Sequence, residues 1–210
     1  MNGSTKVTFA RRAATSGPAL AALLALACLG GCFFEPRSAD PPAQSVTYIP
    51  AQEAKAVLEN LDTALHARDA TGYMNMIGDA FTYVPDSQAR SDYPAVDWDH
   101  WDRAKEYSFI NAFCNSSNVT GVTPALRDST VFADTPSGTK VIWEFIYDIK
   151  STGAGRTTEF RGRAFLTLEL VSNFWKLTKW EDEHGEAPRG GGGTLQTSGD
   201  LRGAFSNGGG

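Results

Sequence analysis

Apolar residues in the first half of the chain recur at the spacing of a helix. After Pro50, which suits the first turn of a helix, they form one stripe: Ala54, Val57, Leu58, Leu61, Ala64 and Leu65. This period predicts an amphipathic helix with one buried face. Asp69 is placed to cap a second, short helix that ends at Gly78, and Asp97 to Phe113 predicts a third, less regular helix.

In the second half the period changes to two, which is typical of half-buried strands. Residues 140–150 carry apolar side chains on one face, at Val141, Trp143, Phe145, Tyr147 and Ile149. Residues 157–171 repeat the pattern, Ser172-Asn173 predicts a tight turn, and a last strand is expected over 174–182. Shorter strands are expected at 80–84 and 126–133. Helices followed by a strand meander predict an α+β fold with a curved antiparallel sheet covered on one side.

Both ends of the chain have the composition of flexible segments. Residues 33–49 contain Pro36, Pro41 and Pro42 and are interpreted as a tether. Residues 185–210 hold ten of the chain's 21 glycines and predict a disordered, Gly-rich tail. Such a composition buries too little apolar surface to offset its chain entropy. A single compact domain of 135 residues is expected between them, at 50–184.

The first 32 residues have the pattern of an export signal. A basic start, an apolar run and a closing motif follow one another: Lys6, Arg11 and Arg12, then Ala19 to Leu29, then Leu29-Gly30-Gly31-Cys32. The closing motif resembles the lipobox of bacterial lipoproteins, which implies lipidation of Cys32. The mature protein is then anchored to a membrane of the cell envelope, on its periplasmic or extracytoplasmic side. An ordinary secretory peptide is the alternative, and Cys28 is a second, poorer lipidation site.

Charge and cysteine content exclude several classes of function. After residue 32 the chain has 16 basic and 24 acidic residues, so the mature protein is acidic. It lacks a basic footprint for phosphate backbones, and nucleic acid is not an expected partner. Cys114 is the one cysteine beyond the signal segment, and no Cys/His spacing matches a zinc site. We therefore expect no metal and no other cofactor, and interpret Cys114 as a small core residue.

Two segments carry a resemblance to a known superfamily. Ala64-Leu65-His66-Ala67-Arg68-Asp69 closes the first helix, and Phe174-Trp175-Lys176-Leu177 with Trp180-Glu181-Asp182 closes the domain. In this order of elements they resemble the nuclear-transport-factor-2-like superfamily, which includes SnoaL-like polyketide cyclases, ketosteroid isomerase and scytalone dehydratase. The resemblance covers about residues 50–184. It implies a cone-shaped, curved antiparallel sheet with N-terminal helices packed on its concave face. A lipocalin-like or unrelated α+β sandwich is the alternative.

The hollow of such a cone is where a ligand would bind, and its expected lining is aromatic and uncharged. The lining residues are predicted to be Tyr83, Trp143, Phe145, Tyr147 and Trp180. No carboxylate or histidine faces inward on 140–149 or 158–170. Isomerases of the superfamily use a tyrosine and a protonated acid in the pocket, and these positions fall at Leu61 and near Ala164 or Leu166. Ketosteroid-isomerase chemistry is therefore not expected.

The polar candidates for chemistry are Asp86, His100 and Asp182. His100 stands among three acids at 97–102, where it is either a general base or a solvated neighbour of acids that complement a helix dipole. The second interpretation is preferred. Asp182 ends the last strand, and Asp86 follows a short one.

Together these features predict a lipid-anchored envelope protein whose domain binds a small apolar ligand or a partner protein without catalysis. The alternative is a SnoaL-like enzyme of the cyclase or dehydratase type that uses Asp86 and His100 for proton transfer. A third interpretation is a structural module with a filled core, because fold alone does not settle function. The sequence does not specify the oligomeric state and is compatible with a dimer.

Overall fold

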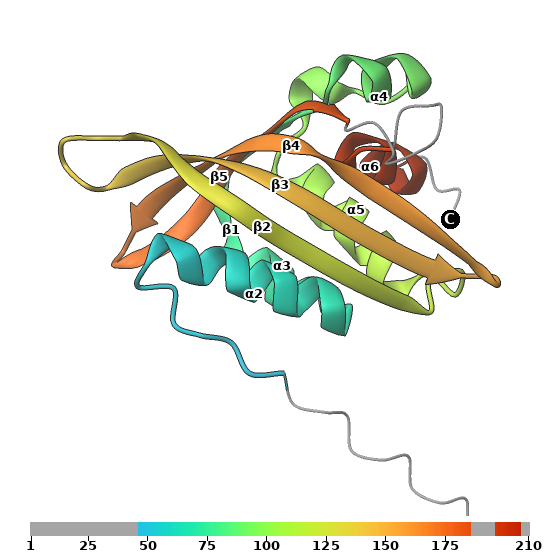
Figure 1. The fold of residues 1–210 in the computed structure, drawn as a ribbon, viewed down its shortest axis with the longest axis horizontal. Helices are drawn as coiled ribbons and strands as arrows, with labels where there is room; N and C mark the ends of the chain where they lie inside the picture. Colours follow the sequence, from blue (N-terminus) through green and yellow to red (C-terminus); the bar gives the residue numbers. More distant parts are fainter. Residues whose placement is uncertain (1–45, 186–195, 207–210) are drawn as a thin grey trace, which may run out of the picture. The chain divides into compact units, whose positions relative to one another are not determined.

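A computed structural model describes residues 46–185 and 196–206 of the chain (Figure 1). The signal segment with Cys32 and the tether up to residue 45 lie outside the described residues, so their interpretation stays a prediction. Within the described ranges, no helix combines the length and the apolar character that crossing a bilayer requires.

Five strands form one curved sheet in the order β1-β5-β4-β3-β2. Their bounds are β1 Ile77–Val84, β2 Gly121–Asp134, β3 Lys140–Gly153, β4 Arg156–Val171 and β5 Phe174–Gly185. Neighbouring strands are antiparallel except for β1 and β5, which are parallel. The turn between β4 and β5 is formed by Ser172 (φ 51°) and Asn173 (φ 68°). Two successive left-handed residues are what a type I′ hairpin turn requires, as predicted.

The two N-terminal helices follow the predicted pattern. α2 (Ala54–Ala67) buries its apolar stripe, in which Val57, Leu61 and Ala64 have no exposed surface. Asp69 caps α3 (Ala70–Met76), because its carboxylate accepts a hydrogen bond from the backbone N–H of Gly72 at 2.9 Å. Both helices contact the sheet, α2 through β2 and β5 and α3 through β1 and β5. The α+β cone predicted from the sequence is thus the observed fold (Figure 1).

The predicted third helix is divided. η1 (Trp98–His100) is a single 3₁₀ turn, and α5 (Arg103–Asn115) begins only after Asp102. The interruption arises because the chain pairs with β1 at this point: Trp101 accepts a hydrogen bond from the N–H of Tyr83, and Asp102 bridges to Thr82. A further short helix, α4 (Ser87–Asp92), has no counterpart among the predicted elements.

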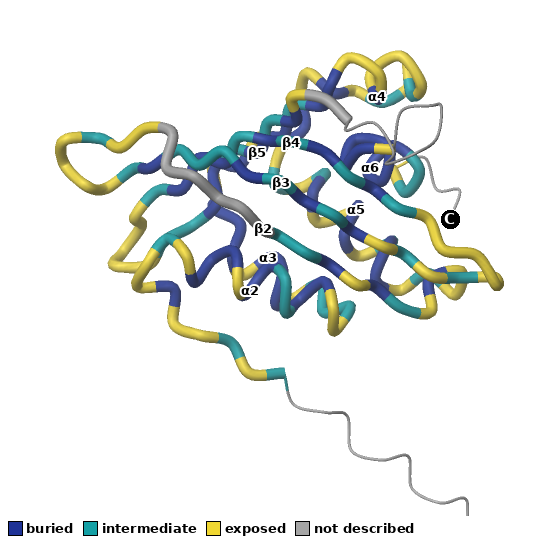
Figure 2. Tube along the Cα trace, viewed as in Figure 1, coloured by how far each residue is buried: buried dark blue, intermediate teal, exposed yellow. Residues whose placement is uncertain are grey.

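The core lies between the concave face of the sheet and the helices (Figure 2). The largest fully buried side chains of the sheet are Trp180, Tyr83, Tyr147, Phe81 and Phe145. On the outer face, charged side chains pair across neighbouring strands, as the alternation predicts. Glu144 binds Arg163 at 2.9 Å, and Lys140 binds Glu169 at 3.0 Å.

The C-terminal segment corrects one prediction. The whole of 185–210 was expected to be a disordered tail, but Ser198–Ser206 form a helix, α6. Leu201 and Arg202 are among the most buried residues of the described chain, at 1% and 2% exposure. Helix α6 contacts α5, α4 and β4, and therefore belongs to the folded domain together with residues 46–185.

Candidate functional site

Helix α6 fills the interior of the cone. Its buried side presents Ser198 to residues of β1, β3 and β5, and Arg202 to Glu106 of α5. Phe205, one turn later, packs edge-on against Phe113 of α5, with ring centroids 5.2 Å apart. The site expected from the sequence is thus occupied by another part of the same chain.

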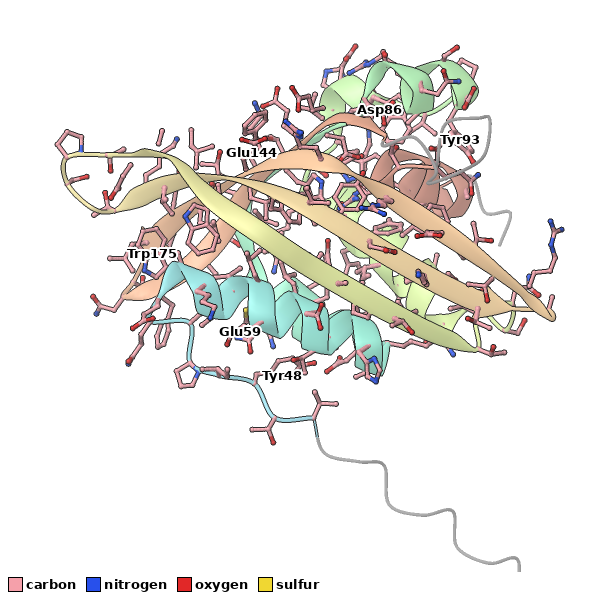
Figure 3. All side chains as sticks on the ribbon, viewed as in Figure 1. Tyr48, Glu59, Asp86, Tyr93, Glu144 and Trp175 are labelled. Carbon is pink, nitrogen blue, oxygen red and sulfur yellow. The ribbon has the colours of Figure 1, made fainter. Side chains whose placement is uncertain are left out.

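The first turn of α6 is capped from within and from outside. Thr197 Oγ1 accepts from the N–H of Asp200 at 3.4 Å, while Asp200 Oδ2 accepts from the N–H of Thr197 at 2.7 Å. This reciprocal arrangement is a capping box, with Asp in place of the usual Glu. Thr197 Oγ1 also donates to Asp86 Oδ2 at 2.6 Å. Asp86 therefore joins the start of α6 to the start of α4, which its other oxygen caps (Figure 3).

Asp182 on β5 is the acceptor at the centre of this contact. Its Oδ2 accepts hydrogen bonds from Tyr83 Oη at 2.6 Å, Ser198 Oγ at 2.7 Å and the N–H of Gly199 at 3.1 Å. Its Oδ1 accepts from Trp180 Nε1 at 2.7 Å. Four donors on two oxygens satisfy a carboxylate, which accepts only. Burial raises the pKa of Asp182, and the donors from Tyr83 and Ser198 oppose that rise.

Two tyrosine hydroxyls, of Tyr83 and Tyr147, complete the polar contacts around the start of α6. Tyr147 Oη accepts the N–H of Ser198 at 2.9 Å, so the first free N–H of α6 is also satisfied. Burial, and next the Asp182 carboxylate, raise the pKa of both Tyr83 and Tyr147 well above the usual value. Both hydroxyl groups are therefore neutral hydrogen-bonding groups at physiological pH.

Arg202 and Glu106 form a fully buried ion pair one turn further along α6. Arg202 Nη2 lies 2.7 Å from Glu106 Oε1, and Nε lies 3.0 Å from Oε2, which is a bidentate geometry. Glu106 also accepts from Tyr73 Oη at 2.6 Å and from Trp101 Nε1 at 2.8 Å. Burial opposes the charge of Arg202, but the Glu106 carboxylate outweighs it and raises the Arg202 pKa.

Three aromatic rings surround the Arg202 guanidinium. Its central carbon lies 4.0 Å from the ring centroid of Tyr83, 4.8 Å from that of Trp180 and 5.0 Å from that of Phe109. Distances below about 6 Å to a ring are typical of cation–π contacts. We call these three rings and Glu106 the guanidinium cage.

The expectation of an uncharged interior was wrong. The inner faces of 140–149 and 158–170 carry no acid, as predicted, but acids reach the interior from other elements. Asp86, Glu106 and Asp182 are all buried, and they come from the start of α4, from α5 and from β5. Among the described residues Arg202 is the one buried cation. The cone thus supplies three buried acids, and α6 supplies the buried cation Arg202 together with a fourth buried acid, Asp200.

The structure brings four of the five predicted lining residues together. One buried cluster contains Tyr83, Phe145, Tyr147 and Trp180. In it the ring of Trp180 packs edge-on against the rings of Phe145 and Tyr147, with centroid distances of 5.3 and 5.8 Å. Trp143 lies on the same face of β3 but is only partly buried. These rings pack against α6 and one another, and a ligand role for them stays a prediction.

The three residues proposed for an enzyme do not converge. The His100 side chain is 81% exposed, and its Nδ1 lies 2.9 Å from Asp97 Oδ1. Hydrogen bonds from Lys105 and then from His100 lower the Asp97 pKa to about 2. Asp86 and Asp182 are buried on either side of the start of α6, and neither hydrogen-bonds to His100. No group of three or more His, Cys, Asp or Glu in the described ranges is placed to hold a metal ion.

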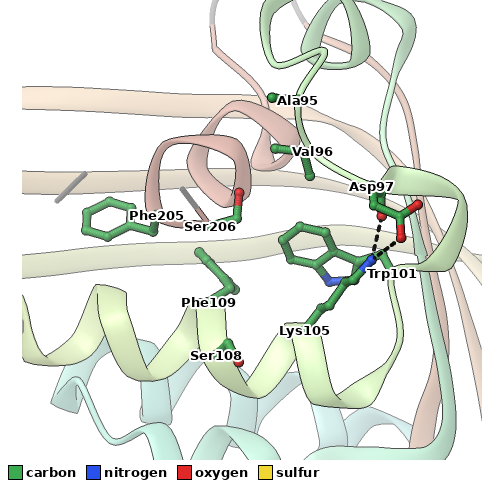
Figure 4. A pocket seen from close by; sticks show the side chains of 9 residues that line it. All are labelled: Ala95, Val96, Asp97, Trp101, Lys105, Ser108, Phe109, Phe205 and Ser206. Atoms are coloured by element: carbon green, nitrogen blue, oxygen red, sulfur yellow. Dashed lines mark hydrogen bonds and ion pairs between the residues drawn. The ribbon is translucent and has the colours of Figure 1, made fainter. Parts of the chain in front are cut away.

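One pocket, of about 340 Å³, lies beside the end of α6 (Figure 4). Its walls are Lys105, Ser108 and Phe109 of α5, Phe205 and Ser206 of α6, and the loop 95–97, with Trp101 between them. Because α6 forms one wall, its displacement would join this pocket to the interior. Cys114 is a buried free thiol whose pKa burial raises to about 12, in agreement with a core role.

Sequence reasoning missed Glu106 and Arg202, the charged pair of the site. A signal for Glu106 was present, since it shares a helix face with Phe109, Ile110 and Phe113 at spacings of three, four and seven. Asp182 lies two residues after the buried Trp180, so period two places both on the inner face of β5. Arg202 gave no comparable signal, because it follows a glycine-rich stretch.

Comparisons with known proteins bear on the fold. No protein-family model matches the chain, and no curated protein matches it. Two solved structures from Novosphingobium aromaticivorans are similar in fold. A provisionally assigned scytalone dehydratase has a TM-score of 0.53 at 10% identity and covers 68% of this chain and 89% of its own. A provisionally assigned aromatic ring hydroxylase has a TM-score of 0.51 at 13% identity. The match covers 63% of this chain and 87% of the hydroxylase chain. The chain thus shares its fold with these two proteins, in agreement with the α+β fold that the resemblance implied.

Proposed function

We propose that this protein is a binding module of the bacterial cell envelope, anchored through a lipidated Cys32, whose cone domain holds a ligand or partner segment in its interior and carries out no catalysis. The anchor and the location rest on the pattern of residues 1–32. The binding role rests on one observation. The interior of the cone holds a helix through hydrogen bonds from β1, β3, β5 and α5, so this surface is built to hold an occupant.

A small apolar molecule suits this interior less well than the sequence suggested. With α6 removed, the carboxylates of Glu106 and Asp182 and the hydroxyls of Tyr73 and Tyr147 would face the occupant. A buried polar group costs free energy unless it is hydrogen-bonded. An occupant with donors and a positive charge is therefore favoured.

The alternative is an enzyme of the cyclase or dehydratase type, because a protein of similar fold carries a dehydratase name. Proton transfer requires a base within hydrogen-bond reach of its substrate. His100 is directed to Asp97 at the surface, and each oxygen of Asp86 is committed to a cap or to Thr197. These contacts support binding over proton transfer.

The binding role can be tested with the full chain and a synthetic peptide of residues 196–206. The double variant Leu201→Ala/Arg202→Ala weakens the docking of α6. Lys55→Ala/Glu59→Ala, an exposed pair on α2, is the matched control. We expect calorimetric titration to show one peptide bound per double variant. Binding to the wild type and control should be at least about tenfold weaker, because a tethered α6 competes at an effective concentration on the order of millimolar. A folded double variant that does not bind the peptide would overturn the proposal.

A further inference from the structure

Helix α6 presents three features to the cone: N–H groups at its start, two glycines against α4, and an arginine between those glycines. The N–H groups of Ser198 and Gly199 bind Tyr147 and Asp182. The positive end of the helix dipole therefore points at a buried carboxylate. This part of the contact recognises the beginning of a helix.

The two glycines allow a close approach that no other residue permits. A Cβ at Gly199 would lie 2.6 Å from Ala89 Cβ and 3.1 Å from Tyr83 Oη. A Cβ at Gly203 would lie 2.4 Å from Cγ of the Tyr93 ring. Asp86 and Tyr93 flank α6 at this wall (Figure 3). The surface next to α4 thus accepts only glycine at these two positions, because any side chain would clash.

The interior also demands a positive charge. Glu106 is completely buried, and Asp182 is 5% exposed. A buried charge without a partner is strongly destabilising. Since Arg202 is the one buried cation in the described chain, an occupant without such a group leaves Glu106 uncompensated.

A guanidinium meets the demand better than an ammonium. It is planar, it matches a carboxylate with two parallel hydrogen bonds, and it stacks on aromatic faces. Both properties are used here: the edge of the Arg202 guanidinium donates two hydrogen bonds to Glu106, and its flat face lies over the ring of Tyr83. A lysine ammonium group would provide the charge but neither the paired hydrogen bonds nor the flat surface.

We propose that the cone interior is a recognition site for an arginine-bearing helical peptide: a helix that starts Ser-Gly, carries its arginine three residues after that glycine, and has a second glycine next to the arginine. This inference rests on the proposed binding function and names the class of its ligand. Residues 198–203 have this pattern. The occupant is therefore an α6 segment, from the same molecule or from a second copy of the chain.

The same molecule is the favoured source. Gly185, at the end of β5, pairs with Gly162 of β4, and Gln196 pairs with Phe160 two residues along the same strand. Two residues of strand span about 7 Å. The ten residues between Gly185 and Gln196 reach far further than that.

Small cations test the cage in the full chain. Arg202→Ala leaves a space the size of the guanidinium next to Glu106. We expect ethylguanidinium to raise the thermal midpoint of this variant more than ethylammonium does at the same concentration, because only bound ligand stabilises. The double variant Arg202→Ala/Glu106→Gln should lose that difference. If the two cations raise the thermal midpoint of Arg202→Ala equally, the guanidinium cage does not select a guanidinium and the proposal is overturned.

Peptide variants test the pattern separately from binding itself. Against Leu201→Ala/Arg202→Ala, peptides 196–206 carrying Arg202→Lys or Gly199→Ala should bind at least about tenfold more weakly than the parent, a difference of about 1.4 kcal/mol. If the parent and both variants bind equally, the ligand class is wrong while the binding function stands. If the parent peptide does not bind, the binding function itself fails.

The oligomeric state of the wild type identifies the source of the helix. Docking within one molecule predicts that the wild type sediments as a monomer at micromolar concentration. A wild-type dimer that dissociates in both Arg202→Ala and Glu106→Gln would place the occupant in a second copy and contradict docking within one molecule.

Discussion

Replacement of Arg202 by alanine is the most informative single perturbation of this fold. The guanidinium makes hydrogen bonds of 2.7 and 3.0 Å to Glu106, and the two side chains are 2% and 0% exposed. Removing one member of a buried ion pair costs about 3–5 kcal/mol, because the other charge stays buried without a partner. In a domain of this size each kcal/mol corresponds to about 2–4 °C, so the midpoint should fall by roughly 6–20 °C.

The loss has an upper limit set by the docking of α6. If the variant releases the helix, water reaches Glu106, and the cost cannot exceed the free energy with which α6 docks. Urea denaturation separates the cases, since a domain that has lost α6 exposes less new surface on unfolding and has a lower m-value. Amide hydrogen exchange of Leu201 reports the release directly.

The matched control is Arg90→Ala, which removes an ion pair of the same 2.7 Å length to Asp99 at the surface. Exposed pairs contribute about 0–1 kcal/mol, so this variant should stay close to the wild type. If Arg202→Ala loses no more stability than Arg90→Ala, and α6 stays protected, the buried pair does not stabilise the docking and the reasoning is refuted.

Three further predictions concern Asp182, the turn between β4 and β5, and Cys114. Because burial raises the folded-state pKa of Asp182, its contribution to stability is greatest below about pH 4 and falls as pH rises through the raised pKa. The stability of Asp182→Asn relative to wild type should therefore improve from pH 4 to 7 in urea titrations, and a constant difference would contradict this. Asn173→Ala, at φ 68°, should cost about 1 kcal/mol by the same assay, whereas Asn173→Gly should be near neutral. Cys114 should react with a thiol reagent at pH 8 only as fast as the domain opens, and reaction at the rate of a free thiol would show that it is accessible.

Much of the fold was readable from local pattern. The stripe of α2, the Asp69 cap and the Ser172-Asn173 turn each follow from backbone chemistry within a few residues. Alternation in β3 and β4 indicated which face of each strand is buried. Such features depend on neighbours in the sequence, and these predictions were confirmed.

The site was harder to predict because its partners are distant in the sequence. Glu106 and Arg202 are 96 residues apart, and Tyr83 and Asp182 are 99 apart. Helix α6 has only nine residues, two of them glycines, so its own propensity is low and tertiary contacts stabilise it. The glycine-rich composition therefore indicated a disordered tail. The sequence did not show that acids from separate elements would meet around one arginine.

Protection of α6 in the full chain tests the central claim most directly. In solution NMR, the N–H of Ser198, bound to Tyr147, should exchange with solvent orders of magnitude more slowly than in the free peptide 196–206, and Arg202 should show contacts to the ring of Tyr83. Exchange of the α6 amides at the rate of the free peptide, with no contact between Arg202 and Tyr83, would show that the cone is empty and contradict the interior described here.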